Sequence, residues 1–175
     1  LEGGGMHQTE RGGFLNIHAD FTMHHHKTNW RRRCNLILFL NPGWQEEWRG
    51  ALELWDRGMK RSEEEVLPLL NHAVLFNTDE DSYHGYPDPI QCPSGVTRKS
   101  LALYYYTEER NPRYKARSTD YRARPGERWK APLIWLDKAA VALYSWLKRK
   151  LGLSDDFASR VLGFLSRKNK SSKKT

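Results

Sequence analysis

A histidine and an aspartate two residues apart, His18 and Asp20, lie in a glycine-flanked stretch of β-forming residues between positions 12 and 21. Because the side chains of a strand alternate between its two faces, the imidazole and the carboxylate would point the same way. They would supply two ligands of a 2-His-1-carboxylate triad, which holds non-haem Fe(II) and leaves the other coordination positions open. His84, in the stretch 81–86, is our candidate for the third ligand.

A second polar pair, Arg98 and Ser100, opens an apolar stretch that we predict to be a buried strand. An arginine at the entrance of a strand can bind a carboxylate through two parallel hydrogen bonds, and a serine two residues further on can add a third. The pair follows His84 after 14 residues, across a connection that three prolines make rigid. It is therefore a candidate carboxylate site.

The order His18-x-Asp20, then His84, then Arg98-x-Ser100 resembles the Fe(II)- and 2-oxoglutarate-dependent oxygenases. The sequence between these residues is most similar to the prolyl 4-hydroxylase-like branch, in segments 18–21, 33–41 and 52–56. The resemblance covers roughly residues 3–108. It departs before the Leu-x-Leu-Trp strand, where the usual Gly-Gly reads Arg49-Gly50, and we expect this difference to affect a turn and not a ligand.

The resemblance implies a mainly β fold, a double-stranded β-helix or jelly-roll barrel with iron near one mouth. It implies that His18, Asp20 and His84 bind Fe(II), and that Arg98, helped by Ser100, binds the far carboxylate of 2-oxoglutarate. No catalytic residue beyond the metal ligands is implied. O2 would be the oxidant, and the resemblance leaves ascorbate open as a further cofactor.

The carboxylate ligand indicates hydroxylation of a C–H bond, with release of succinate and CO2, because related halogenating enzymes have a small residue at that position. The resemblance favours a prolyl residue in a peptide or protein as the substrate. A free amino acid or small metabolite stays open, because the loops at 22–33 and 57–65 carry no signature of a substrate. A third alternative is a non-enzymatic, cupin-like binding module with a basic tail that contacts nucleic acid.

The charge of the chain is unevenly placed. Residues 1–109 hold 11 Lys and Arg against 16 Asp and Glu, whereas residues 110–175 hold 18 against 5. Such a basic segment could approach nucleic acid, but a solvated helical face with a lysine-rich end is the preferred interpretation. We accordingly treat nucleic acid as a disfavoured partner.

The expected organisation is a catalytic core at 1–109 whose N-terminal part is missing, a basic extended segment at 110–130, a helical pair at 131–168 and a disordered tail at 169–175. C-terminal helices follow from the apolar stripe at 134–147, which would pack on the barrel or on a partner subunit to form an oligomer. In the core we expect strands within 1–10 and at 13–21, 33–41, 51–56, 71–76 and 99–107, with a loop at 57–65.

Within the strand at 13–21, the alternation predicts that Phe14 and Asn16 share the inward face with His18 and Asp20. The run His24-His25-His26 is expected to be a loop near the mouth and not a ligand set, because consecutive residues of a strand face opposite ways.

No apolar run approaches 18 residues, which argues against a membrane span. The two cysteines, Cys34 and Cys92, are expected to be reduced thiols, and on this basis we predict a cytoplasmic location.

Overall fold

The computed structural model describes residues 4–24, 26–110 and 117–136, together with residues 139, 143 and 150. The chain divides into two compact units, Leu1–Ala131 and Pro132–Thr175. The described residues of the second unit are helical, in the region where the helical pair at 131–168 is expected. The second expected helix and the tail lie outside the described residues. Within the described part, no helix is long and apolar enough to cross a membrane.

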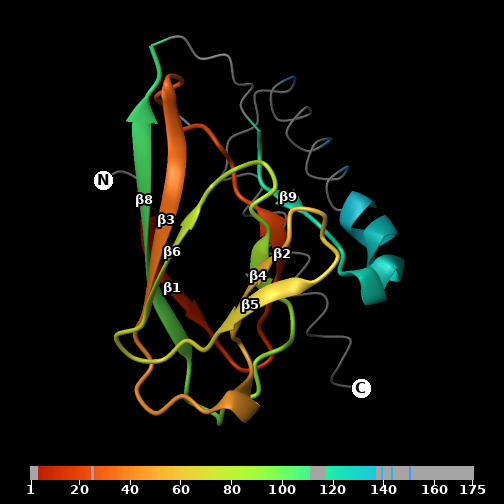
Figure 1. Ribbon diagram of the computed structural model, residues 1–175. Helices are drawn as coiled ribbons and strands as arrows, with labels where there is room; N and C mark the ends of the chain where they lie inside the picture. Colours follow the sequence, from red (N-terminus) through yellow and green to blue (C-terminus); the bar gives the residue numbers. More distant parts are fainter. Residues whose placement is uncertain are drawn as a thin grey trace. The chain divides into compact units, whose positions relative to one another are not determined.

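The first unit is built from two antiparallel sheets, which lie opposite each other in Figure 1. One sheet has the order β1-β8-β3-β6, formed by Gly4–Thr9, Arg98–Glu108, Trp30–Phe39 and Ala73–Asn77. The other has the order β5-β4-β7-β2-β9, formed by Ser62–Val66, Leu52–Trp55, His84–Tyr86, Leu15–Ala19 and Asp120–Tyr121. Two short 3-10 helices, η1 (Glu46–Trp48) and η2 (Pro125–Lys130), complete the described elements of this unit.

The long strands β3 and β8 form the centre of the first sheet. Their register runs from Trp30 opposite Glu108 to Phe39 opposite Ser100. Asn41 fastens their far ends: its amide donates to the carbonyls of Pro68 and Lys99, and its Oδ1 accepts from the Lys99 amide. A residue that the sequence marks as turn-forming therefore also closes the sheet beside Arg98.

The expected strands agree with the structure except in two segments. The predicted loop at 57–65 is wrong in its second half, because Ser62–Val66 is strand β5, paired with β4 along the edge of the sheet. The segment 110–130 is not simply extended: its described part contains strand β9, which pairs with β2, and helix η2.

The predicted inward face of the strand at 13–21 is also partly wrong. The pairing of β2 with β7 is irregular between Leu15 and His18, as in a β-bulge, which shifts the alternation. Leu15 lines the internal cavity together with His18 and Asp20, whereas Phe14 is 50% exposed and Asn16 is not among the lining residues. The bulge therefore places an apolar side chain where the regular alternation predicts a polar one.

The other face of β2 carries a small apolar core. Ile17, Ala19 and Tyr83 are buried together there, and Trp55 and Met59 pack against them. Cys34 and Cys92 are both free thiols, as expected. The cytoplasmic location inferred from them stays a prediction.

Candidate metal centre

Two neighbouring strands bring the predicted triad together. His18 in β2 lies directly opposite His84 in β7, and Asp20 follows immediately after β2. One nitrogen or oxygen atom of each side chain lies within 4.8 Å of the corresponding atom of the other two. The Nε2 atoms of His18 and His84 lie 3.7 Å and 3.5 Å from the Asp20 carboxylate oxygens. These are the donor types, and the spacing, that one small ion can bridge.

Backbone carbonyls fix the tautomer of both imidazoles. The Nδ1 of His18 lies 2.9 Å from the Asn16 carbonyl oxygen, and the Nδ1 of His84 lies 3.0 Å from the Ser82 carbonyl oxygen. Because a carbonyl oxygen only accepts, Nδ1 carries the proton in each neutral ring. The Nε2 lone pairs are then left facing Asp20, just as a backbone carbonyl bonded to Nδ1 orients a metal-binding histidine.

Two polar side chains from β3 hold the carboxylate of Asp20. The Nδ2 of Asn35 donates to its Oδ2 at 2.7 Å, and the Nη2 of Arg32 lies 3.0 Å from the same oxygen. Arg32 in turn donates from Nε to the Asn35 Oδ1 at 2.8 Å, and its guanidinium lies over the rings of Phe21 and Tyr104. Since Oδ2 receives both bonds, Oδ1 is the oxygen of Asp20 that accepts none from a described residue.

The environment favours a charged carboxylate and an uncharged His84. Burial by itself raises the pKa of Asp20, but the charges of His84, Arg32 and His18 and the Asn35 hydrogen bond outweigh burial and lower it. Burial and the neighbouring His18 lower the pKa of His84 to about 4, against the opposing pull of Asp20. An ionised carboxylate beside a neutral imidazole is the state that a divalent cation requires.

Arg98 lies at the start of β8 with 3% of its surface exposed. Its Nε donates to the Gly50 carbonyl at 2.8 Å, and its guanidinium lies over the rings of Tyr86 and Phe39. Among the described residues, no carboxylate is paired with it, and burial lowers its pKa to about 10. It therefore stays charged at neutral pH as a buried cation without a protein counter-ion in the described part of the chain.

One cavity of about 480 Å³ joins the triad to the arginine. The second sheet contributes His18, Asp20 and His84, and the first contributes Arg98 and Ser100. Ser100 is 2% exposed and lies opposite Phe39 of β3. All five residues singled out in the sequence thus border one internal space between the sheets.

The Arg49-Gly50 turn lies closer to this site than the sequence suggests. Gly50 has a φ of +78°, and a Cβ there would lie 3.2 Å from the Arg98 side chain. Arg49 adopts a φ of 59°, in the left-handed region that favours glycine. The departure from Gly-Gly therefore falls on the turn that receives the Nε hydrogen bond of Arg98.

Sequence reasoning missed Arg32, Asn35 and Tyr121. Arg32 and Asn35 are polar residues three positions apart at the start of an otherwise apolar strand, and this pattern could have identified them. Tyr121 packs against the His18 ring from β9, a strand too short to give a periodic signal. His24, from the histidine run, accepts hydrogen bonds from the amides of His26 and Lys27 and contacts Trp30 and Tyr106, so it helps to build a loop.

Comparison with known families agrees with this geometry. The family model described as the 2OG-Fe(II) oxygenase superfamily matches residues 4–106, more than half of the chain. The chain therefore belongs to the 2OG-Fe(II) oxygenase superfamily, whose members depend on Fe(II) and 2-oxoglutarate. The comparison with curated proteins gave no match.

Solved structures include two similar chains. A Pseudomonas putida prolyl-4-hydroxylase shares 22% identity with a TM-score of 0.42, over 60% of this chain and 50% of that one. A structure of prolyl 4-hydroxylases from Phytophthora capsici shares 24% identity with a TM-score of 0.43, over 59% of this chain and 31% of that one. The chain thus spans half or less of the length of these structures, and TM-scores this low assign neither fold nor substrate.

Proposed function

We propose that this chain is the catalytic core of an Fe(II)- and 2-oxoglutarate-dependent dioxygenase that hydroxylates a C–H bond, with His18, Asp20 and His84 as metal ligands. The observation that carries the proposal is the shared cavity, in which this donor set and the buried Arg98 face the same space. The order of the first eight strands, which places β1, β8, β3 and β6 opposite β5, β4, β7 and β2, supports a jelly-roll barrel.

The donor set fits a ferrous ion. Both imidazoles present Nε2, and Oδ1 of Asp20 is left for the metal because Arg32 and Asn35 occupy Oδ2. Three protein ligands from one side would leave the remaining positions to co-substrate and O2. When bound, the iron would supply the oxidising chemistry. The residues of the chain hold the ligands in one geometry.

The surroundings of Arg98 fit the far carboxylate of 2-oxoglutarate. A buried guanidinium can bind a carboxylate with two parallel, charge-assisted hydrogen bonds. The Nε of Arg98 is already bonded to Gly50, so its two Nη atoms are left for the ligand. The Ser100 hydroxyl, on the same face of β8 two residues later, is placed to add a third bond. Ascorbate remains a further proposal that no feature of the site addresses.

For the substrate we propose a prolyl residue in a peptide or protein, on the resemblance of segments 18–21, 33–41 and 52–56 to the prolyl 4-hydroxylase-like branch. The test is succinate release by the purified chain with Fe(II), 2-oxoglutarate and a panel of proline-containing peptides, with free proline as the small-molecule arm. Mass spectrometry should find a gain of one oxygen on proline in a peptide. Product on free proline alone would favour the small-molecule alternative.

The Asp20→Ala variant is the matched control, and it should release no succinate above background. Full activity of Asp20→Ala would refute the triad. Absence of succinate from the wild-type chain, with every substrate and with cell-extract proteins, would refute the dioxygenase itself.

A further inference from the structure

Tyr121 of β9 extends a row of rings through the metal centre. β9 pairs with β2 so that Tyr121 lies opposite His18, while His84 lies opposite His18 on the other side. The centroids of the His18 and Tyr121 rings are 5.3 Å apart, with 36° between their planes. Because directly opposed residues of neighbouring strands share a face, Tyr121 lies on the same face of the second sheet as His18 and packs beside its ring, outside the residues that line the cavity.

The family match ends at residue 106, so it assigns no role to β9. Backbone hydrogen bonds nevertheless tie the chain on both sides of Tyr121 to β2 and to the residues that follow β2. The Arg122 amide donates to the Ile17 carbonyl at 2.8 Å, and the Thr22 amide donates to the Arg117 carbonyl at 3.4 Å. The segment after the matched core is thus built onto β2, which carries His18, and onto the residues that directly follow it.

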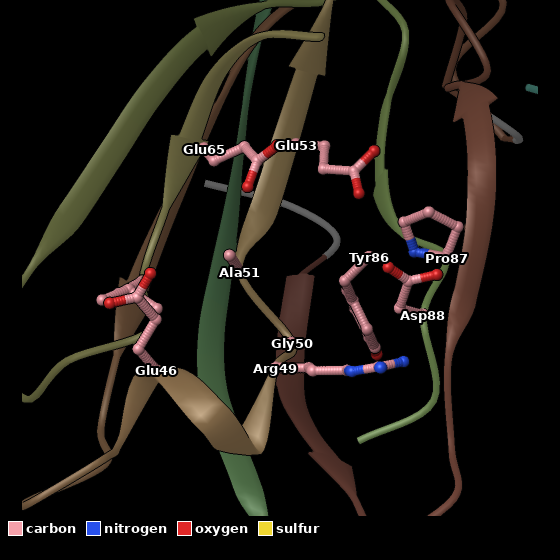
Figure 2. A pocket seen from close by; sticks show the side chains of 10 residues that line it. Glu46, Arg49, Gly50, Ala51, Glu53, Glu65, Tyr86, Pro87 and Asp88 are labelled. Carbon is pink, nitrogen blue, oxygen red and sulfur yellow. The ribbon is translucent and has the colours of Figure 1, made fainter. Parts of the chain in front are cut away.

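Arg124 fastens this segment to two other elements. Its Nη2 lies 2.8 Å from Oδ1 of Asp88 and 3.1 Å from Oε1 of Glu127, and its Nη1 lies 3.6 Å from Oε1 of Glu53. Figure 2 shows the carboxylates of Glu53 and Asp88 directed into the same space from β4 and from the connection after β7. The hydrogen bonds with Glu127 and Asp88 raise the pKa of Arg124, so the clamp keeps its charge.

We propose that Tyr121 is a positioning residue of the metal centre, and that Arg124 holds it there by clamping β9 onto the second sheet. The side-chain torsion χ2 of a histidine is broad, so the bond from Nδ1 to Asn16 leaves freedom that a packed ring removes. Tyr121 also keeps water from one side of the imidazole. The inference rests on the proposed function, because it takes His18 to be a ligand.

The test is a titration with Mn(II), followed by the electron paramagnetic resonance signal of the free ion. Tyr121→Ala should weaken Mn(II) binding about 10-fold or more, as the loss of an outer-shell partner does. Tyr121→Phe should restore binding to within about 2-fold of wild type, because it keeps the ring that packs against His18. Tyr105→Ala is the matched control: this tyrosine is 39% exposed and lies on β8, in the other sheet from His18. It should bind as the wild type does.

Wild-type affinity in Tyr121→Ala would overturn the inference while leaving the metal centre in place. No binding by the wild-type chain would instead overturn the metal centre, and the inference with it. If Tyr121→Ala does not fold, Arg124→Gln tests the inference instead. Arg124→Gln leaves the proposed metal ligands unchanged and should still weaken Mn(II) binding several-fold. Arg61→Gln, whose side chain is 78% exposed, is its matched control. Equal affinities of Arg124→Gln and wild type would refute the clamp.

Discussion

Replacing Arg98 with Met should separate co-substrate binding from stability. The side chain of Arg98 is buried, charged and, among the described residues, without a carboxylate partner. Methionine keeps an unbranched apolar stem of similar length and removes the guanidinium. The change therefore deletes the proposed carboxylate clamp but leaves the three proposed metal ligands untouched.

The loss of 2-oxoglutarate affinity should be large. Removing one partner of a buried charge pair costs about 3–5 kcal/mol, because the other charge is left without compensation. At 1.4 kcal/mol for each factor of ten, this corresponds to a loss of roughly 100-fold or more in affinity for 2-oxoglutarate. Affinity for the metal ion should change little.

The stability of the ligand-free protein should change far less. Lowering the pKa of Arg98 from its ordinary value to about 10 means that burial disfavours the charged form by about 3 kcal/mol. Methionine removes that cost. It also loses the Nε bond to Gly50, worth about 1 kcal/mol, and the contacts with the Tyr86 and Phe39 rings, worth about 1–2 kcal/mol. The two sides nearly cancel, so the free energy of unfolding should stay within about 2 kcal/mol of wild type.

The assay is calorimetric titration of 2-oxoglutarate into Mn(II)-loaded protein, together with urea unfolding of the metal-free protein. Arg61→Met, at a side chain that is 78% exposed, is the matched control and should change neither quantity. Unchanged 2-oxoglutarate affinity in Arg98→Met would refute the clamp. A loss of 2-oxoglutarate affinity together with a large fall in the free energy of unfolding would show that Arg98 is a structural residue. It would refute the near-cancellation of the two stability effects.

Three further changes test the surroundings of the site. Asn35→Leu removes the hydrogen bond to Asp20 and leaves the buried Nε of Arg32 without its acceptor. It should lower the free energy of urea unfolding by about 2–3 kcal/mol and weaken Mn(II) binding about 10-fold. An unchanged Mn(II) affinity would contradict the proposal that Asn35 holds the Asp20 carboxylate for the metal. Gly85→Ala would place a Cβ 2.8 Å from the Leu15 carbonyl oxygen at the bulge. It should therefore lower the free energy of unfolding by about 1–3 kcal/mol. An unchanged free energy of unfolding would mean that the backbone at the bulge shifts without cost. The pKa of His84 is lowered to about 4 in the folded state, so as the pH falls below about 6.5 the unfolded chain takes up a proton before the folded chain does. The free energy of unfolding of the metal-free protein should therefore be about 2 kcal/mol lower at pH 5 than at pH 7, and His84→Asn should reduce this difference. A wild type that is equally stable at both pH values would refute the lowered pKa of His84.

Much of the site could be anticipated because it depends on local geometry. His18 and Asp20 share the cavity because side chains two apart in an extended chain face the same way. Arg98 and Ser100 line it for the same reason at the start of β8. His84 is already the candidate for the third ligand in the sequence, the resemblance supports that choice, and the structure brings His84 opposite His18.

The parts that could not be predicted depend on long-range pairing. The irregular pairing between Leu15 and His18 depends on β7, and nothing in residues 15–18 marks it. Strand β5 reads as a loop because it carries three consecutive glutamates, which are tolerated on an edge strand but have low β propensity. β9 has two residues and is a strand only through its pairing with β2, so no periodic pattern could reveal it.

The central claim is that one cavity binds Fe(II) and 2-oxoglutarate together, and an anaerobic titration followed by visible absorption tests it most directly. A weak charge-transfer band should grow when 2-oxoglutarate is added to the Fe(II)-loaded wild-type chain. Neither addition alone should produce the band, and Asp20→Ala should not develop it. A wild-type chain that gives no band at saturating Fe(II) and 2-oxoglutarate would contradict the account.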